Sequence, residues 1–335
     1  MAVLEVRGLS IDLGIKGVMV RALTDVSLTI ERGEVLGLVG ESGSGKSLTA
    51  LSIAGLLPGN ARVVSGSVRL MGEDVIGKTD RELNRLRTRS VAMVFQNPTS
   101  YLNPVLTVGA QIAEILDLNP ELIDGGHDLS TRERRRRAWR ASVDVLRLVR
   151  IPDPERVVRR YPFELSGGMQ QRVVIAMALI RRPDLVIADE ITTALDVTVQ
   201  AQILSLLSEL RRTIGMTLLL ITHDMGIVAQ LADRVAVMYS GSVVEIADVR
   251  RVFREPRHPY SKALLETVPT ISGGRTIFRP IPGAMPALTD PPPGCRFHPR
   301  CPDAFGDCAR VRPEPRRVAH GQAVACHLYE GVRGE

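Results

Sequence analysis

The sequence is poor in cysteine, in aromatic residues and in long apolar runs. Residues 1–294 contain no cysteine, and only 4% of the 335 residues are aromatic. The apolar stretches, such as residues 173–180 and 218–221, fall well short of the roughly 20 residues that a membrane-spanning helix needs. The first residues also lack a charged segment followed by an apolar block, which is the pattern of a secretory signal. We therefore expect a chain that stays in the cytoplasm and does not itself cross the membrane.

Positive charge is in slight excess, with a formal net charge of +6. Such an excess would suit nucleic acid or an anionic membrane surface. The most concentrated basic segment, residues 132–137, is interrupted only by Glu133 and precedes a helical pattern over residues 138–149. No aromatic residue interleaves with this basic segment, as stacking on single-stranded nucleic acid would require. We interpret it as the solvated start of a helix and expect no nucleic-acid partner.

Short apolar runs alternate with amphipathic stretches and turn signals from the first residues to about residue 247, which is typical of an α/β domain. The pattern predicts strands over residues 34–39, 90–96, 185–189 and 218–222, and a strand pair over residues 234–246 that turns at Ser240-Gly241. It predicts helices over residues 46–57, 168–181 and 197–213.

Two changes along the chain indicate its domain organisation. Between residues 97 and 164 the strand signal fades and helical periodicity replaces it, which indicates a helical insertion in the α/β core. After residue 256 periodicity disappears, prolines crowd into residues 280–299, and the cysteines begin. We therefore predict one domain over residues 1–255, with a helical part at about 97–165, and a second domain over residues 256–335.

Residues 40–47 read Gly-Glu-Ser-Gly-Ser-Gly-Lys-Ser, a complete phosphate-binding loop (P-loop) of the form G-x-x-x-x-G-K-S. The loop follows an apolar strand and opens a helix, which is the context that such a loop needs. Its glycines let successive N–H groups point inward, and the helix N-terminus adds a partial positive charge. Lys46 is expected to reach the β and γ phosphates, and the Ser47 hydroxyl to bind Mg²⁺. The residues predicted to bind ATP here are Gly40, Ser42, Gly43, Ser44, Gly45, Lys46, Ser47 and Thr49.

A P-loop needs a second, acidic element, and residues 185–190 supply it. This apolar run ends in Asp189, at the carboxyl end of the predicted strand, where α/β sheets bind ligands. Asp189 is predicted to hold the metal. Glu190 follows directly and is predicted to polarise the attacking water as a general base.

Residues 165–172, Leu-Ser-Gly-Gly-Met-Gln-Gln-Arg, resemble the signature motif of ABC-transporter ATPases, and together with the P-loop they identify the sequence as a member of that family. Gln96 resembles the Q-loop glutamine, Ala194-Leu195-Asp196 the D-loop, and His223 the switch histidine. The resemblance implies catalytic roles for Glu190, His223 and Gln96. It also implies that the remaining nucleotide contacts come from Ser166, Gly167, Gly168 and Asp196, and that Mg²⁺ is bound by Ser47, Gln96 and Asp189.

The family resemblance also implies a fold and a set of partners. The fold is an α/β P-loop NTPase with a parallel-sheet core, an antiparallel β subdomain and a helical subdomain, followed here by a small cysteine-containing domain. In such ATPases two chains face each other, and each ATP lies between one P-loop and the other chain's signature. The expected partners are therefore a second ATPase subunit, identical or homologous, and two transmembrane permease subunits. The expected location is peripheral, on the cytoplasmic side of the cell membrane.

Two positions depart from the family pattern. Ile191 follows the predicted catalytic glutamate where many members have proline, and we expect its N–H and freer φ to loosen the turn that leads to the D-loop. In addition, no Phe, Tyr, Trp or His precedes Phe95, so an aromatic residue that stacks on adenine upstream of the P-loop is missing. We expect adenine to rest on aliphatic residues such as Val18 or Val20.

The tail resembles that of one importer family. Residues 253–265, the segment Ile281-Pro282-Gly283 and residues 291–302 resemble the region that follows the ATPase core in oligopeptide and dipeptide importers. The resemblance implies an importer of di- or oligopeptides that works with a substrate-binding protein. Some relatives move nickel, sugars or other solutes, so the cargo stays open.

The four cysteines are all in this tail, as Cys295, Cys301, Cys308 and Cys326. Their spacing lacks the close C-x-x-C pair that is usual in zinc sites. Members of this importer family with these cysteines carry a [4Fe-4S] cluster, so the resemblance implies one here as well. Zinc is the second interpretation, and a set of buried thiols the third.

Two other functions compete with transport. A soluble ABC ATPase that acts on nucleic acid or ribosomes is supported mainly by the basic composition, but such proteins usually carry two ATPase cores or a long coiled-coil insertion, and this sequence has neither. A regulatory nucleotide-binding module without turnover is disfavoured because Glu190 is present.

Overall fold

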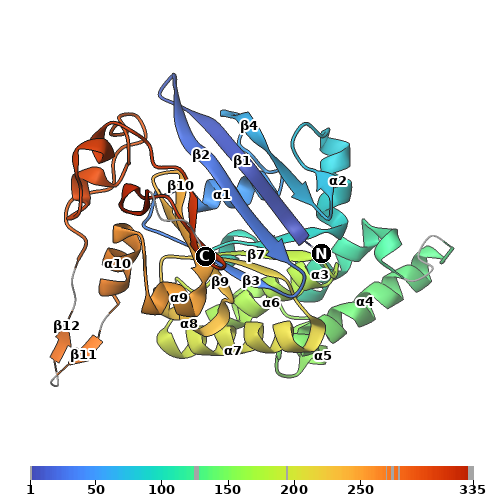
Figure 1. Cartoon of the computed structure of the whole chain (residues 1–335). Coiled ribbons are helices and arrows are strands. Elements are labelled where there is room, and N and C mark those ends of the chain that lie inside the picture. The colour runs from blue at the N-terminus through green and yellow to red at the C-terminus, as the bar shows by residue number, and fades with distance from the viewer. Residues whose placement is uncertain are drawn as a thin grey trace. The chain divides into compact units, whose positions relative to one another are not determined.

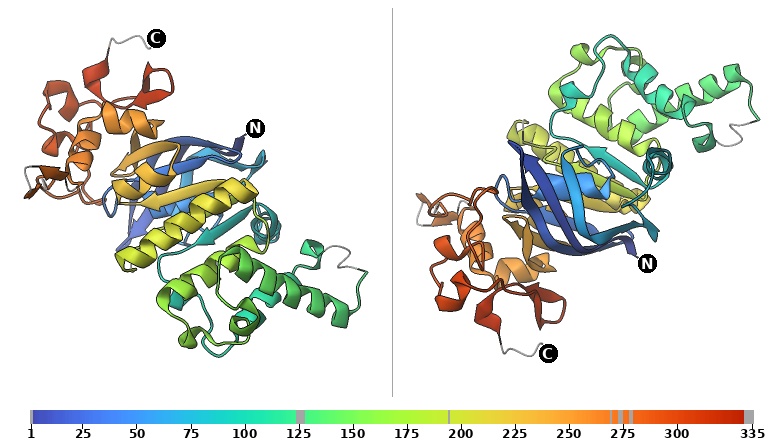
Figure 2. Two further views of the ribbon diagram at one scale, coloured as in Figure 1. Left: turned by 90° about the horizontal axis from the view of Figure 1, so that it is seen from below. Right: turned by 90° about the horizontal axis from the view of Figure 1, so that it is seen from above.

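The computed structural model describes residues 2–123, 128–193, 195–268, 270–272, 275–277 and 280–330. The chain folds as two compact units (Figures 1 and 2). The first unit combines Met1–Lys78 with Leu218–Glu335, and the second is Thr79–Thr217. The domain boundary that we predict near residue 255 from composition remains a prediction.

The first unit contains an antiparallel sheet with the strand order β2-β1-β4-β5. Its strands are β1 (Ala2–Ile15), β2 (Val18–Glu31), β4 (Ala61–Leu70) and β5 (Glu73–Asp74). Figure 1 shows β1 and β2 as a long pair of neighbouring strands, with β4 on the other side of β1. The side chains of Leu4, Leu9 and Ile11 on β1 are fully buried, so this sheet contributes a core of its own.

The other strands of the first unit follow the order β13-β14-β10-β9-β3-β8. They are β3 (Val35–Val39), β8 (Leu218–Thr222), β9 (Arg234–Tyr239), β10 (Ser242–Asp248), β13 (Arg316–Ala319) and β14 (Gln322–Val324). The central strand β3 pairs in parallel with both β8 and β9. Because parallel strands are covered on both faces, β3 and β8 consist of buried residues throughout.

The predicted hairpin over residues 234–246 is confirmed as β9 and β10. Its turn lies at Ser240 and Gly241, whose φ angles of 42° and 82° suit a two-residue hairpin turn. The strands predicted over residues 34–39 and 218–222 are confirmed as β3 and β8.

Helix α1 (Lys46–Ile53) is shorter than the predicted 46–57. Gly55 lies in the left-handed region with φ 63°. The Leu56 N–H donates to the Leu51 carbonyl at 2.7 Å, and the Gly55 N–H donates to the Ser52 carbonyl at 3.2 Å. This pair of bonds is a Schellman motif, which ends the helix before Pro58 does. The first unit also contains α8 (Met225–Leu231), α9 (Val249–Arg254) and α10 (Pro259–Glu266).

The second unit holds two parallel strands and most of the helices. Strands β6 (Val91–Val94) and β7 (Leu185–Asp189) confirm the predictions over residues 90–96 and 185–189. The helices are α2 (Asp80–Arg89), α3 (Val108–Asp117), α4 (Thr131–Leu148), α5 (Pro154–Val157), α6 (Gly167–Leu179) and α7 (Val197–Ile214). Short 3-10 turns lie at Pro98–Ser100, Pro120–Leu122 and Pro162–Glu164. Figure 2 shows α3 to α6 gathered together. The helical part that we predict at about residues 97–165 remains a prediction.

The basic segment 132–137 forms the first turns of α4, as we predicted. Ser130 caps the helix by accepting the Glu133 N–H, and Arg136 and Arg137 pair with the Glu133 carboxylate at 3.9 and 3.4 Å. Ala138 is buried, whereas the arginines before it are largely exposed. The segment is therefore the solvated start of an amphipathic helix.

The tail after residue 255 belongs to the first unit and packs against its strands in spite of an irregular sequence. It contains α10, the strand pair β11 (Thr270–Ser272) and β12 (Arg275–Ile277), and 3-10 turns at His298–Arg300, Gly306–Ala309 and His327–Tyr329. Strand β14 of the tail pairs with β10. The tail residues Tyr260 and Phe297 are buried and contact Tyr239 of β9, with ring centroids 4.6 and 5.1 Å from its ring.

Candidate nucleotide site

The P-loop crosses from the end of β3 to the start of α1. A Cβ atom on Gly40 would lie 2.1 Å from the Met238 carbonyl oxygen, and one on Gly45 would lie 2.7 Å from a Leu23 methyl group. Gly45 also has φ 104°, which L side chains rarely adopt. These two glycines let the loop pass close to β9 and β2 before the helix begins.

The loop is held largely by its own backbone and by Lys46. The Lys46 ammonium donates to the carbonyl oxygens of Gly40 and Glu41 at 2.8 and 3.0 Å. The Thr49 hydroxyl donates to the Gly45 carbonyl at 3.0 Å. Ser44, Lys46 and Thr49 are buried, whereas the predicted ligands Ser42, Gly43 and Ser47 are exposed.

The N-terminus of α1 faces this loop without a side-chain cap, because its N-cap residue is Gly45. The first N–H groups of a helix have no partner within the helix and carry a partial positive charge. Glycine at the N-cap leaves these groups to an anion. The geometry of the loop therefore suits the binding of phosphate.

His223 lies at the same end of the sheet as the P-loop. The parallel register pairs Val39, just before Gly40, with Thr222, just before His223. Asp224 fixes the turn that follows, because its carboxylate accepts the N–H groups of Gly226 and Ile227 at 2.7 and 3.3 Å. His223 itself is exposed.

In the second unit, the ends of β6 and β7 bring the other predicted catalytic groups together. Val94 pairs with Ala188, so Gln96 follows one strand and Asp189 and Glu190 end the other at the same edge. Glu190 has φ 49°, an uncommon conformation for a residue other than glycine and one that tends to mark functional positions. The Thr193 hydroxyl donates to the Glu190 carbonyl at 3.0 Å and supports this turn. Ile191, which takes the place of the family's proline, is buried at the turn.

The signature residues lie at the start of α6. Ser166 is the N-cap, and its hydroxyl accepts the Met169 N–H at 3.4 Å. A Cβ atom on Gly168 would lie 2.6 Å from Val199, so the starts of α6 and α7 can approach closely only with glycine here. Asp196 caps α7 by accepting the Val199 N–H at 2.9 Å. Ala194 of the predicted D-loop lies outside the described residues.

The residues proposed to rest under adenine differ in exposure. Val18 is 61% exposed at the start of β2, whereas Val20 is 7% exposed and packs in the core. Of the two, only Val18 presents its side chain to solvent, where a base could reach it.

Sequence reasoning missed one group of residues at the P-loop. The guanidinium of Arg300, in the tail, donates to both carboxylate oxygens of Glu41 at 2.7 and 3.1 Å. The Glu41 N–H donates to the Tyr260 hydroxyl at 2.9 Å. One feature of the sequence could have indicated this contact. Glu41 is an acidic residue inside a phosphate-binding loop, so a positively charged residue from elsewhere in the chain is expected to pair with it.

The four cysteines gather at one small pocket of the tail. Cys295, Cys301, Cys308 and Cys326 all line it, and they lie beside His258 and His327. The Cys295 N–H donates to the Cys308 carbonyl at 2.8 Å, which draws two of these segments together. Burial raises the pKa values of Cys295 and Cys301 and raises the pKa of Cys326 to about 11.

The ring nitrogens of the histidines at this pocket mostly have hydrogen-bond partners. His327 bonds to the Glu330 carboxylate at 2.6 Å and to the Val311 carbonyl at 2.7 Å. His258 accepts the Tyr260 N–H through Nδ1 at 3.0 Å, and burial lowers the pKa of this imidazole to about 3. Its buried Nε2 has no hydrogen-bond partner among the described residues. Within the same residues, no group of three or more His, Cys, Asp or Glu side chains is placed to hold a metal ion.

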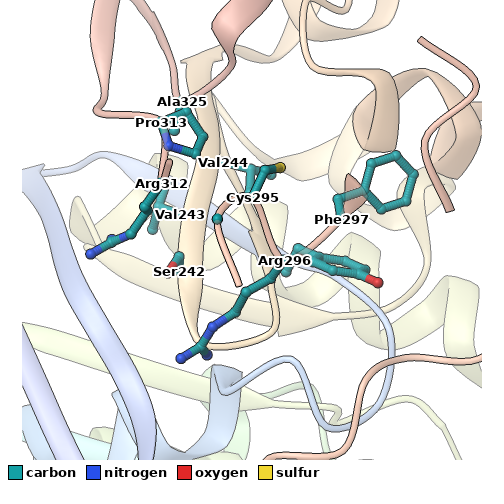
Figure 3. Close-up of a pocket in the computed structure, with 11 residues that line it drawn as sticks. Ser242, Val243, Val244, Cys295, Arg296, Phe297, Arg312, Pro313 and Ala325 are labelled. Carbon is teal, nitrogen blue, oxygen red and sulfur yellow. The ribbon is translucent and has the colours of Figure 1, made fainter. Parts of the chain in front are cut away.

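A neighbouring cavity lies where the tail meets β10 (Figure 3). Its lining includes Val243 and Val244 of β10 and Cys295, Arg296 and Arg312 of the tail. The guanidinium of Arg296 donates to the Ser240 carbonyl, and also to the Thr24 hydroxyl at 3.3 Å. The cavity has a volume of only about 30 Å³, room for roughly one water molecule. It is therefore a gap in the packing and is too small for a ligand.

No helix in the described part of the chain is long and apolar enough to span a bilayer.

Comparison with known proteins identifies two family regions. Residues 23–193 match the model of the family described as ABC transporter, and residues 244–308 match that described as oligopeptide/dipeptide transporter, C-terminal region. The second match includes three of the four cysteines.

Curated relatives match along nearly the whole chain. The dipeptide transport ATP-binding proteins DppD of Haemophilus influenzae and of Bacillus subtilis are 43% and 44% identical to it. Each alignment covers 98% of this chain, and it covers 96% of the first relative and 95% of the second. The oligopeptide transport ATP-binding protein OppD of Mycobacterium tuberculosis is 46% identical over 99% of this chain, which spans only 52% of that longer relative.

Solved structures agree with these matches. A dimeric post-hydrolysis state of the ATP-binding cassette MJ0796, bound to ADP and Pi, has a TM-score of 0.62 and 29% identity. The similarity covers 74% of this chain and 99% of that one. CbiO1 from Clostridium perfringens, part of the ABC transporter complex cbiONQ, has a TM-score of 0.63 and 28% identity over 76% of this chain and 91% of its own.

Proposed function

Because the chain belongs to the ABC transporter family of ATP-binding proteins, we propose that it binds and hydrolyses ATP as the energising subunit of a membrane importer. The observation that carries this proposal is the P-loop, where Lys46 and the uncapped start of α1 face a turn that suits phosphate. The ABC ATPase fold itself is established by the family match and by the solved cassettes.

The residues have distinct roles in this proposal. Gly40, Ser42, Gly43, Ser44, Gly45, Lys46, Ser47 and Thr49 form the phosphate cradle. Ser47, Gln96 and Asp189 would hold Mg²⁺, which would neutralise part of the charge of the phosphates. Glu190 accepts the proton of the attacking water, and His223 contacts the γ phosphate.

ATP also needs a second chain. Ser166, Gly167 and Gly168 are at the exposed start of α6, where they can meet a nucleotide held by a partner, and Asp196 at the start of α7 approaches the same interface. The solved MJ0796 cassettes, which are dimers, support this arrangement. The further partners are two transmembrane permease subunits and, indirectly, a substrate-binding protein. The chain would lie peripherally on the cytoplasmic side of the cell membrane.

Peptides are the proposed cargo. Support comes from the match of residues 244–308 to the oligopeptide/dipeptide transporter C-terminal region and from the names of the relatives. The competing function on nucleic acid or ribosomes finds no support among these relatives, which are named as peptide transport ATP-binding proteins.

We also propose that Cys295, Cys301, Cys308 and Cys326 hold a [4Fe-4S] cluster, which would crosslink the irregular tail. The gathering of all four thiols at one pocket supports it, as does the buried Nε2 of His258, which could donate to a sulfur atom there. A single zinc ion would need its sulfur ligands within about 4 Å of one another. The described residues contain no group of three or more side chains placed to hold a metal ion, so the choice of a cluster over zinc rests on the resemblance of the tail to that importer family.

The function is tested by isolating the chain with its membrane subunits in mild detergent and measuring ATP hydrolysis. The proposal expects two permease-type partners and a rate that rises when a peptide-loaded binding protein is added. A chain that co-purifies with ribosomes, and whose ATPase rate responds to RNA instead, would contradict it.

A further inference from the structure

The tail contacts the P-loop through a buried ion pair. Arg300 is the last residue of the 3-10 turn His298–Arg300 and immediately precedes Cys301. Its side chain is 4% exposed and makes a two-pronged contact with the Glu41 carboxylate, at 2.7 and 3.1 Å. Such fork-shaped pairs fix geometry as well as charge, since both N–H groups must align with both oxygens.

Glu41 is held at each of its polar groups. Its carboxylate binds Arg300, its N–H donates to the Tyr260 hydroxyl at 2.9 Å, and its carbonyl accepts the Lys46 ammonium at 3.0 Å. The Ser44 N–H also donates to this carbonyl at 3.2 Å. The residue that supports the ammonium of Lys46 is therefore the one that the tail anchors.

Arg300 is itself fixed by its surroundings. It donates to the carbonyl oxygens of Pro282 and Ile281 at 2.8 and 3.5 Å and to the Tyr239 hydroxyl at 3.3 Å. Burial alone would lower the pKa of Arg300, but the bonds to Glu41 and Tyr239 outweigh it and raise this pKa. The guanidinium is thus a rigid, permanently charged group.

The charge of Glu41 makes this contact matter for the nucleotide. A carboxylate inside a loop that binds polyphosphate repels its ligand and weakens the attraction supplied by the loop N–H groups and Lys46. Arg300 neutralises the carboxylate and turns it away into a bonded pair. The loop therefore keeps an acidic residue without losing its attraction for anions.

We propose that Arg300 is a positioning residue of the nucleotide site, which holds the P-loop through Glu41 and cancels its charge. This makes the C-terminal region a part of the ATP site of its own chain. The inference rests on the proposed binding of ATP by the P-loop.

The test is a titration of the full chain with MgATP. Arg300→Met keeps the apolar stem and removes the charge, so Glu41 is left unpaired beside the phosphates. The expected result is an affinity about tenfold weaker, which corresponds to about 1.4 kcal/mol. Arg317→Ala, which removes an exposed arginine of the same tail, is the matched control and should bind ATP as the parent does.

The decisive comparison adds Glu41→Gln to Arg300→Met. The double variant has no unpaired carboxylate, so its affinity should return to within about threefold of the parent. A merely structural role for Arg300 would lower the folded fraction without changing the affinity of the folded chain, and a second substitution would not reverse the loss.

Two results would overturn the inference while leaving the function intact: parent-like affinity of Arg300→Met, or a double variant as weak as Arg300→Met alone. If Arg300→Met does not fold, Arg300→Lys carries the test, because lysine keeps the charge but loses the fork. It should weaken binding by about threefold, and parent-like affinity of this variant would overturn the inference. A parent chain that fails to bind MgATP would contradict the proposed function itself, and this inference with it.

Discussion

The P-loop and the tail are stabilised in opposite ways. The P-loop spans residues 40–47, and its bonds are mostly local, from Lys46 to Gly40 and from Thr49 of α1 to Gly45. The tail has only 3-10 turns between residues 295 and 330 besides β13 and β14, and its packing depends on Phe297, on buried arginines and on the cysteine pocket. A local structure tolerates changes elsewhere in the chain, whereas the tail depends on contacts between residues far apart in the sequence.

This difference suggests that the P-loop and the other motifs carry out the chemistry, whereas the tail stabilises them. The residues expected to face phosphate and water lie at the ends of β3, β6, β7 and β8 and at the starts of α1 and α6. The tail contacts the P-loop through Arg300 at Glu41 and through Tyr260, and it contacts neighbouring segments through Arg296 at Ser240 and Thr24. Substitutions in the catalytic motifs should therefore abolish turnover in a folded chain, and substitutions in the tail should lower stability or affinity.

The largest effect is expected from Glu190→Gln. The amide cannot accept the proton of the attacking water, so hydrolysis should fall by about 10² to 10⁴-fold. MgATP binding should persist, and the variant should accumulate as a closed dimer in size-exclusion chromatography with ATP. Hydrolysis at the parent rate would show that Glu190 is not the base.

Lys46→Ala should come next. It removes the ammonium that bonds to Gly40 and Glu41 and that is expected to face the β and γ phosphates. A hydrogen bond to a charged group contributes about 1.5 to 3 kcal/mol, so ATP affinity should fall by about tenfold to a hundredfold. Calorimetric titration that finds the parent affinity would refute the assignment of Lys46.

Mixing two variants that each lack a different part of the ATP site should give an intermediate rate of hydrolysis. In a homodimer, Ser166→Arg blocks the signature and Lys46→Ala blocks the P-loop, so each variant alone should have no intact site. A mixture of the two chains should recover at most one intact site per mixed dimer. Full hydrolysis by Ser166→Arg alone would exclude a signature that acts on the partner's nucleotide.

The smallest effect on turnover is expected in the tail. Cys308→Ser should lower the iron content of anaerobically purified protein and destabilise the tail by about 1 to 3 kcal/mol, in the usual range for loss of a buried ligand. The parent should hold about four irons and absorb broadly near 400 nm. One zinc per chain and no iron would instead support the zinc interpretation, and neither metal would leave plain thiols.

The same contrast explains which parts of the fold and of the candidate site could be predicted from the sequence. The P-loop, β7 and His223 were predictable because each is a short contiguous pattern whose flanking strand or helix has its own periodicity. The end of α1 was missed because Gly55, and not Pro58, stops the helix. The pair of Arg300 with Glu41 was missed because 259 residues separate the two, and no local pattern links them.

In the tail, too, features that depend on residues close in sequence were predictable and long-range pairings were not. Its composition predicted a cysteine site, and the four thiols do line one pocket. The pairing of β14 with β10 could not be predicted, because β14 has only three residues and no alternation that a periodicity would reveal.

The most direct test compares hydrolysis at saturating MgATP for Glu190→Gln and Cys308→Ser, each incorporated with the same membrane subunits and normalised to folded chain. We predict that Cys308→Ser stays within about threefold of the parent, whereas Glu190→Gln loses at least about a hundredfold. Equal loss in both variants, or a parent-like rate for Glu190→Gln, would contradict the division between a catalytic core and a supporting tail.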